Sequence, residues 1–306
     1  MMNDISIIYN TPHSMPLGIL IAQYFYLTGL SAGSFVVSVI AILGGKEEYK
    51  PLGKIGAVLA PVCLVMAPLN LIADMWQPAR FWHLFFYFNP QSPITYGSLL
   101  LTSYPISATI YAYFVYTNNQ KMAKLFAIIG IPLAISVHGY TGFILALGKG
   151  RVLWNTALMP TLFLVSAMVS GIALMIIIAS IRNKYMSKGW TDEEKEKDRG
   201  LIFGLGKFMA GTIVADMFLL LNDVLILFTS TQDAYHAADM LLFGKFAPKF
   251  IGVEIVLGAF IPLIILMLPK TNKKLWAVNL ASLLVMIGIF AMRFSVVVGG
   301  QSLPLH

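Results

Sequence analysis

The sequence predicts an all-α integral membrane protein with eight transmembrane helices. Of its 306 residues, 58% are hydrophobic and only 11% are charged. A soluble globular domain has about 25% charged residues, so this chain has too little polar surface to face water on all sides. Crossing the roughly 30 Å hydrocarbon core takes about 20 apolar residues in a helix. Eight segments meet that requirement, namely 17–43, 55–75, 96–116, 123–147, 156–181, 203–229, 248–268 and 275–298.

The Lys and Arg residues between these segments predict the orientation of the chain. Fourteen of them lie in the first, third, fifth and seventh connections, and five lie in the others. Cytoplasmic loops of membrane proteins are enriched in Lys and Arg, so both termini are expected outside the cytoplasm. The net charge of +7 does not indicate nucleic-acid binding, because the basic residues form no patch. Residues 1–306 are therefore expected to form one integral membrane domain.

Two connections are longer than turns. Residues 77–95 are mostly aromatic and carry Pro78 near their start, which predicts a helix lying in the membrane interface on the outer side. Residues 183–202 include the charge-rich run SKGWTDEEKEKDRG and predict a solvated cytoplasmic loop.

The sequence lacks the ligands of common redox centres. Of five histidines only His138 lies inside a predicted span, whereas a haem held between membrane helices usually takes two His ligands. The single cysteine, Cys63, excludes an internal disulfide and a cluster ligated by cysteines of this chain. No zinc spacing or nucleotide-binding glycine loop is present. We therefore expect no metal, haem or iron–sulfur cluster in this chain.

Polar residues inside the apolar spans are the candidate functional residues, because polar groups are unfavourable in lipid. At 1.5 Å per helical residue, most of them fall in the predicted outer half of the bundle. This asymmetry counts against simple transport and suits a small amphiphile that enters from lipid and reacts near the outer face. The residues are Gln23, Tyr24, Asn70, Asp74, His138, Tyr140, Asp216, Asn222, Asp223, Glu254 and Arg293.

The charged members of this group have two interpretations. Asp216 and Asp223 are seven residues apart and therefore share a helix face. Arg293 is the one basic residue deep in a span and requires a carboxylate partner among Asp216, Asp223 and Glu254. The group is either a structural network of ion pairs or a path for protons.

The remaining candidates also have structural explanations. Tyr24 and Tyr140 are ordinary packing residues if their hydroxyls find partners. His138 can bond to a backbone carbonyl. Asp74 precedes the break at Met75–Pro78 and can cap the helix that follows.

Several sequence blocks resemble the NrfD-type family, the quinone-interacting membrane subunits of polysulfide reductase and its relatives. The resemblance covers nearly the whole chain with its spacings preserved. The blocks are DMWQPARFWHLFFYFNPQSPITYGS (Asp74–Ser98), GYTGFILAL (Gly139–Leu147), Trp154-Asn155, PTLFLVSAMVSG (Pro160–Gly171), GLSAGSF (Gly29–Phe35) and RFSVVVGGQ (Arg293–Gln301).

The resemblance implies a bacterial cytoplasmic-membrane anchor built from two four-helix bundles, with both termini outside. Its implied partners are a four-cluster ferredoxin-like iron–sulfur subunit and a molybdopterin catalytic subunit, besides membrane lipid. Arg80 and His83 lie in the family's characteristic loop, where the iron–sulfur subunit is expected to dock.

The resemblance also implies a quinone site near the outer face. Its span-four tyrosine matches Tyr140. The family has a histidine in span one where this chain has Tyr24, so the second quinone oxygen is expected at Tyr24, Gln23 or His138.

The expected function is oxidation of menaquinol, with electrons passing to the iron–sulfur subunit. Asp74 is the first candidate to accept the protons, and Asp216, Asp223, Glu254 and Arg293 are further candidates, because a buried carboxyl group is a workable relay. The terminal substrate would react on another chain. Alternatives are quinone reduction, an ion or solute transporter that binds cargo at Asp216, Glu254 and Arg293, and a pure anchor.

Overall fold

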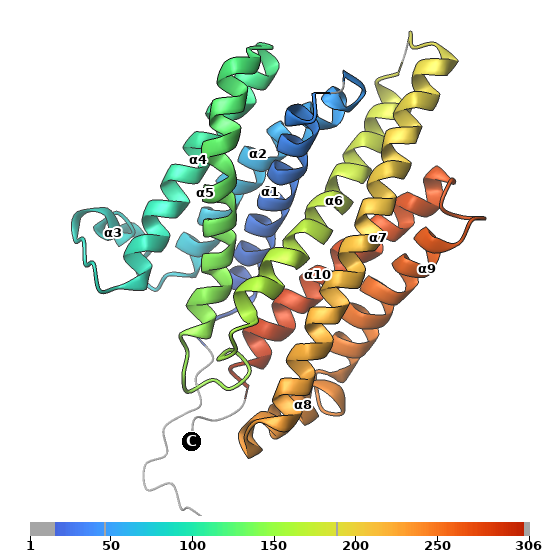
Figure 1. The fold of residues 1–306 in the computed structure, drawn as a ribbon. Coiled ribbons are helices and arrows are strands. Elements are labelled where there is room, and N and C mark those ends of the chain that lie inside the picture. Colours follow the sequence, from blue (N-terminus) through green and yellow to red (C-terminus); the bar gives the residue numbers. More distant parts are fainter. Residues whose placement is uncertain (1–15, 46, 188, 303–306) are drawn as a thin grey trace, which may run out of the picture.

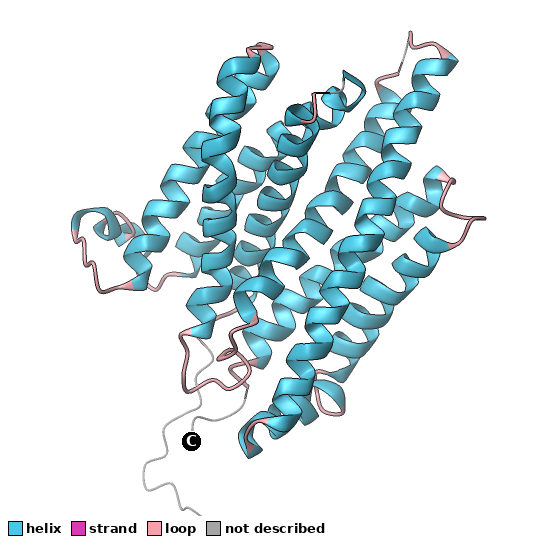
Figure 2. Ribbon diagram, in the orientation of Figure 1, coloured by secondary structure: helices cyan, strands magenta, loops and turns pink. Residues whose placement is uncertain are grey.

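The computed structural model describes residues 16–45, 47–187 and 189–302, and within these ranges all regular structure is helical (Figure 2). In this part of the chain eight helices are long and apolar enough to cross a membrane, which confirms the predicted number. They are α1 (Ile19–Leu43), α2 (Lys50–Asp74), α4 (Pro93–Tyr116), α5 (Gln120–Ala146), α6 (Met159–Tyr185), α7 (Asp192–Thr229), η3 (Pro248–Phe260) continued by α9 (Ile261–Met267), and α10 (Leu275–Gly299).

The helices pack in two groups of four. Helices α1, α2, α4 and α5 form one group, and α6, α7, η3 with α9, and α10 form the other (Figure 1). Helices α1 and α6 join the groups by a close crossing at Gly33 and Gly171. A Cβ atom at Gly171 would lie 2.6 Å from the Cα atom of Gly33, so the two backbones touch. Small residues allow this approach, as is common where membrane helices meet.

Hydroxyl groups hold the first group together. Ser31 Oγ donates to the carbonyl oxygen of Ala60 at 2.8 Å, which links α1 to α2. Ser38 Oγ lies 3.0 Å from the Tyr111 hydroxyl and links α1 to α4. Such bonds between helices compensate for the polar groups that lipid cannot solvate.

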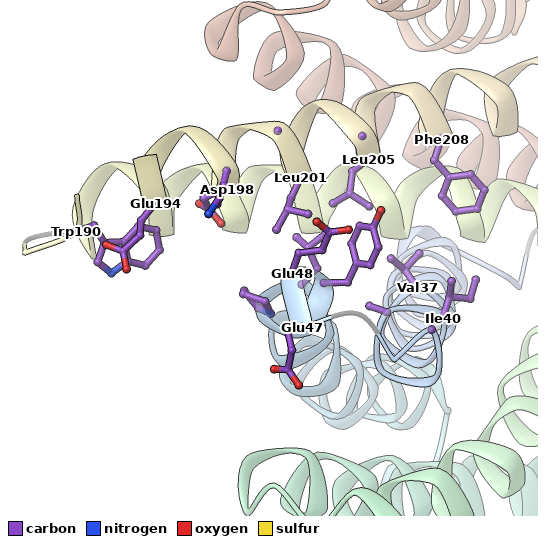
Figure 3. Close-up of a pocket in the computed structure, with 18 residues that line it drawn as sticks. Val37, Ile40, Glu47, Glu48, Trp190, Glu194, Asp198, Leu201, Leu205 and Phe208 are labelled. Atoms are coloured by element: carbon purple, nitrogen blue, oxygen red, sulfur yellow. The ribbon is translucent and has the colours of Figure 1, made fainter. Parts of the chain in front are cut away.

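Different helices and connections lie at the two ends of the bundle. The beginning of α1, the end of α10 and the short helix α8 (Gln232–Leu242) lie at one end, which we call the α8 end. The connection between α6 and α7 lies at the opposite end, the α6–α7 end. There a groove opens between α7 and the corner that joins α1 to α2 (Figure 3). The placement of the α8 end outside the cytoplasm stays a prediction.

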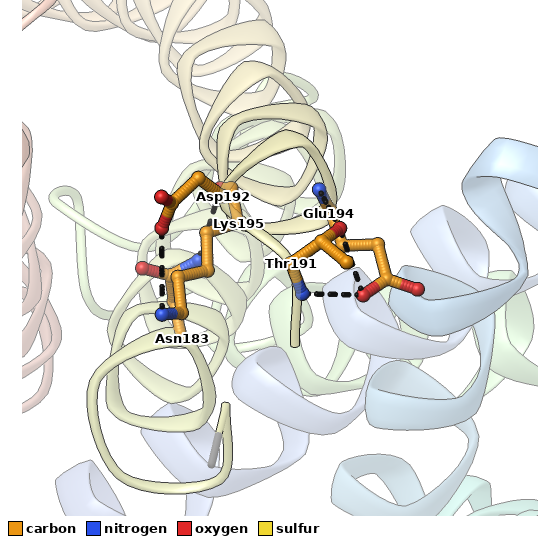
Figure 4. A network of polar contacts seen from close by, with 5 residues as sticks. All are labelled: Asn183, Thr191, Asp192, Glu194 and Lys195. Atoms are coloured by element: carbon orange, nitrogen blue, oxygen red, sulfur yellow. Dashed lines mark hydrogen bonds and ion pairs between the residues drawn. The ribbon is translucent and has the colours of Figure 1, made fainter. Parts of the chain in front are cut away.

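The charged stretch 183–202 is mostly helical, contrary to the loop expected from its sequence. Helix α6 continues to Tyr185, and α7 begins at Asp192. Thr191 and Glu194 form a capping box there: Thr191 Oγ1 accepts from the Glu194 amide at 3.3 Å, and Glu194 Oε2 accepts from the Thr191 amide at 2.8 Å (Figure 4). This cap satisfies amide groups that a helix start otherwise leaves free, so the polar run extends α7 beyond its apolar part.

Residues 77–95 form two short turns in place of the single interfacial helix expected. These are η2 (Pro78–Arg80) and α3 (His83–Phe86), which stand out from the side of the bundle next to α4. Their aromatic side chains are largely uncovered, with Phe86 at 77% and Tyr87 at 73% exposure. The prolines of this stretch keep the helical turns short, since proline removes an amide donor and restricts the residue before it.

Two further features were not predicted. Helix α8 is amphipathic and buries Ala234, Ala237, Ala238 and Leu241, at the spacing of one helix face. The seventh span begins as a π-helix, η3, which is a rare conformation often found at functional sites.

Candidate functional site

Tyr24 and Tyr140 come together near the α8 end. Tyr24 lies five residues after the start of α1, and Tyr140 lies six residues before the end of α5. Tyr24 is 3% exposed, Tyr140 is half-buried, and the two are close enough to interact electrostatically. Neither hydroxyl has a hydrogen-bond partner among the described residues. A hydroxyl in a membrane helix normally finds a partner, so this pair is free to bind a further polar group.

Gly97 of α4 makes room for Tyr140. A Cβ atom at Gly97 would lie 2.5 Å from Cε1 of the Tyr140 ring, well inside van der Waals contact. The tyrosine ring therefore rests on the bare backbone of α4. Gly97 belongs to the block Asp74–Ser98 but was not recognised as a site residue, because its effect depends on a helix distant in the sequence.

The other two candidates for the quinone site point elsewhere. Gln23 is exposed, while its neighbour Tyr24 faces the packed interior. His138 is fully buried and lies against Gly29, where an added Cβ atom would be 3.1 Å from its Cε1. His138 and Tyr140 are two residues apart on one helix, so their side chains leave it in different directions.

His138 belongs instead to a buried centre with Arg293. His138 Nε2 donates to the carbonyl oxygen of Phe163 at 2.7 Å. Arg293 Nη2 donates to the same carbonyl at 3.0 Å and to Ser166 Oγ at 2.6 Å. The guanidinium carbon also lies 3.8 Å from the centre of the Phe163 ring, a cation–π arrangement. Both side chains are completely buried. His138 Nδ1 has no partner in the described part of the chain.

Carboxylates surround this centre at a distance. Asp216 and Glu254 interact electrostatically with Arg293, and Asp223 interacts with Glu254. Among the residues described, no carboxylate lies within 4.0 Å of the Arg293 guanidinium, so Asp216 and Glu254 act on it from a longer distance and form no contact ion pair. One oxygen of each of these carboxylates is shielded and unbonded, as are Nε and Nη1 of Arg293. Arg293 can offset at most one of the three negative charges, and each carboxylate keeps an oxygen available for a proton.

Asp74 is separate from this centre. It is the last residue of α2, and its Oδ1 lies 3.9 Å from the position of an added Cβ atom at Gly18, just before α1. The positive end of the α1 dipole favours a carboxylate there. The following turn, η2, receives no side-chain cap, so Asp74 does not act as the cap considered from the sequence.

The candidate docking residues lie on the projecting aromatic segment. Arg80 is exposed, and His83 is packed between Trp82 and Tyr87 with ring centres 4.0 Å and 5.3 Å away. They are therefore displayed away from the bundle. Among the described residues no group of three or more His, Cys, Asp or Glu side chains could hold a metal ion.

Hydrogen bonds link the first and last spans at the α8 end. The Gln301 side chain accepts from the Leu17 amide at 2.9 Å and donates to the Leu17 carbonyl at 2.8 Å, which joins α1 to α10. Trp154 Nε1 donates to the carbonyl of Val296 at 2.7 Å, and its indole lies on the backbone of Gly300. The blocks Trp154-Asn155 and RFSVVVGGQ thus have a structural role beside the site.

Comparison with known proteins identifies the family of this chain. The family model described as polysulphide reductase, NrfD matches residues 8–304. The chain is 30% identical to the Hdr-like menaquinol oxidoreductase integral membrane subunit of Archaeoglobus fulgidus, covering 95% of this chain and 72% of that protein. It is 30% identical to one of the polypeptides of polysulfide reductase from Wolinella succinogenes, covering 92% of this chain and 93% of that protein. It is also 27% identical to one of the subunits of selenate reductase from Mesobacillus selenatarsenatis, covering 94% of this chain and 74% of that protein. The chain is therefore a multi-pass integral membrane protein of the polysulphide reductase NrfD family.

Proposed function

We propose that this chain is the membrane subunit of an oxidoreductase complex and oxidises menaquinol between Tyr24 and Tyr140. The observation that carries the proposal is the pair of tyrosine hydroxyls, close together and free of hydrogen-bond partners in the described chain. A quinol has an oxygen at each end of its ring, so two separate hydroxyls can orient it. The name of the Archaeoglobus fulgidus relative, a menaquinol oxidoreductase subunit, supports this substrate.

Oxidation of one quinol releases two electrons and two protons. Asp74 is the proposed first proton acceptor, because it lies at the same end of the bundle as the tyrosines. The carboxylates around Arg293 offer a second route, since Asp216, Asp223 and Glu254 each keep an unbonded oxygen. Gln23 and His138 are less suited to bind the quinol. Gln23 faces outward, and His138 is bonded to the Phe163 carbonyl.

The electrons require a partner protein. We place a four-cluster ferredoxin-like iron–sulfur subunit at the projecting segment that carries Arg80 and His83, where exposed aromatic rings offer a contact surface. A molybdopterin subunit would then reduce the terminal substrate, so this chain supplies the quinone site alone. The proposed location is the bacterial cytoplasmic membrane, with the α8 end outside.

Substitution of the tyrosines tests the proposal. Tyr24→Phe and Tyr140→Phe each remove one hydroxyl, and we expect turnover of the assembled complex with a soluble menaquinol analogue to fall about tenfold or more. Asp74→Asn is expected to slow the same step while leaving assembly intact. Tyr113→Phe, on the exposed face of α4 at 63% exposure, is the matched control. Full turnover in both site variants would contradict the proposed site.

A further inference from the structure

Two grooves flank the beginning of α7 at the α6–α7 end, and their charges are opposite. One, of about 1240 Å³, lies between α7 and the α1–α2 corner, and its rim carries Glu47, Glu48 and Glu194 (Figure 3). The other, of about 670 Å³, lies between α6, α7 and α10. Among the described residues, three cations and no carboxylate line this second groove. They are Lys184, Lys195 and Arg199. We call it the basic groove.

The cations of the basic groove are largely available. Lys184 and Arg199 are exposed and form no ion pair within the described chain. Lys195 has one weak partner, Asp192, at 3.7 Å. The nearest buried carboxylate, Asp198, is already bonded to Arg182 and to Asn183 Nδ2, the latter at 3.0 Å. Within the described chain, the long Lys195–Asp192 contact is therefore the one ion pair that offsets the positive charge at the mouth of the groove.

Below this mouth the groove is partly apolar and partly polar. Ile181, Leu275 and Leu283 line it and belong to the membrane-spanning parts of α6 and α10. Ser180 also lines it, is 5% exposed, and has a shielded Oγ atom without a hydrogen-bond partner in the described chain. Asn279 presents a second shielded and unbonded oxygen in the same groove. Buried hydroxyls and amides normally have partners, so a bound polar group is the simplest explanation.

We propose that the basic groove binds an anionic phospholipid. Its phosphate lies at Lys184, Lys195 and Arg199, its ester oxygens reach Ser180, and an acyl chain follows Leu283. A soluble phosphate would use only the cations, whereas the apolar wall inside the membrane span fits a lipid chain. Basic grooves between transmembrane helices are suited to anionic lipid headgroups.

Binding measurements test this proposal. Native mass spectrometry of the purified protein in detergent would compare phosphatidylglycerol with phosphatidylcholine. Each Lys or Arg beside an anionic lipid is worth about fivefold in affinity, so Lys184→Ala/Arg199→Ala should weaken phosphatidylglycerol binding by about 25-fold. Lys197→Ala is the matched control, since Lys197 lines the acidic groove and is bonded to Glu193 at 2.9 Å. It should bind within twofold of the wild type.

A second variant tests the inner part of the groove. Ser180→Ala removes the unbonded hydroxyl and should weaken phosphatidylglycerol binding a few-fold without lowering the thermal stability of the lipid-free protein. Equal binding by the wild type and the double variant would overturn the proposal. So would displacement of the lipid by glycerol phosphate at equal concentration, which would indicate a site for soluble anions. None of these outcomes depends on the quinone site.

Discussion

The substitution Gly97→Ala is the most specific test of the tyrosine site, because it replaces neither tyrosine nor any other residue with a polar side chain. The added Cβ atom would lie 2.5 Å from Tyr140 Cε1, whereas ordinary contact begins at 3.4 Å. The ring must therefore move by about 0.9 Å. Tyr140 is only half-buried, so the ring has space to turn outward, and its hydroxyl moves with it.

The displacement predicts a large loss of activity and a small loss of stability. A misplacement of about 1 Å at a reacting centre can lower a rate about 100-fold. The free energy of unfolding should fall by about 1 kcal/mol, the lower end of the range for overpacking, since a side chain yields and no backbone must shift. Turnover of the assembled complex with a menaquinol analogue measures the first effect, and thermal unfolding in detergent measures the second.

Gly139→Ala is the matched control. Gly139 precedes Tyr140 on the same helix, and an added Cβ atom there would meet nothing within 4 Å. This variant should keep wild-type turnover. In a Tyr140→Phe background, Gly97→Ala should add little, because the hydroxyl it displaces is already absent. Wild-type turnover of Gly97→Ala, or full additivity with Tyr140→Phe, would refute the reasoning.

Two further predictions concern stability. Trp154→Phe removes one of the two donors to the Val296 carbonyl, which keeps the Gly300 amide at 3.1 Å, and should lower the free energy of unfolding by about 1 kcal/mol. Trp276→Phe, at 63% exposure, should change thermal unfolding little. Gly258→Ala places a Cβ atom against the backbone of α10 and should lower the free energy of unfolding by about 3 kcal/mol or more, measured as a loss of folded protein after extraction. Gly252→Ala, in the same π-helix but facing open space, should fold normally; equal yields of the two would contradict the packing described.

The spans were predictable because lipid imposes a simple rule. Each helix must satisfy its own backbone hydrogen bonds and present about 20 apolar residues, so hydropathy alone located all eight. The errors fell where that rule does not apply. The high charge of residues 187–200 predicts a loop, whereas Thr191 and Glu194 have the spacing of a capping box, which predicts the helix start that is found.

The site was less predictable, because it depends on the directions of side chains from helices distant in the sequence. Depth along the spans predicts that most polar candidates lie in the outer half of the bundle, and the structure brings two of them, Tyr24 and Tyr140, close enough to interact. Depth also suggested an ion pair for Arg293, whereas its guanidinium binds the Phe163 carbonyl and Ser166. Every residue has a backbone carbonyl, so the residue types do not predict which carbonyl Arg293 contacts.

The bonds between Leu17 and Gln301 have a consequence for biosynthesis. The two residues are 284 positions apart, and they meet at the point where the first and last spans lie together. A nascent polypeptide emerges from the ribosome with its first helix in place long before its last. The Leu17 amide and carbonyl therefore gain their Gln301 partner only after every other span has been synthesised. The Leu17–Gln301 hydrogen bonds can therefore form only in a completely synthesised subunit, and they distinguish it from an interrupted one.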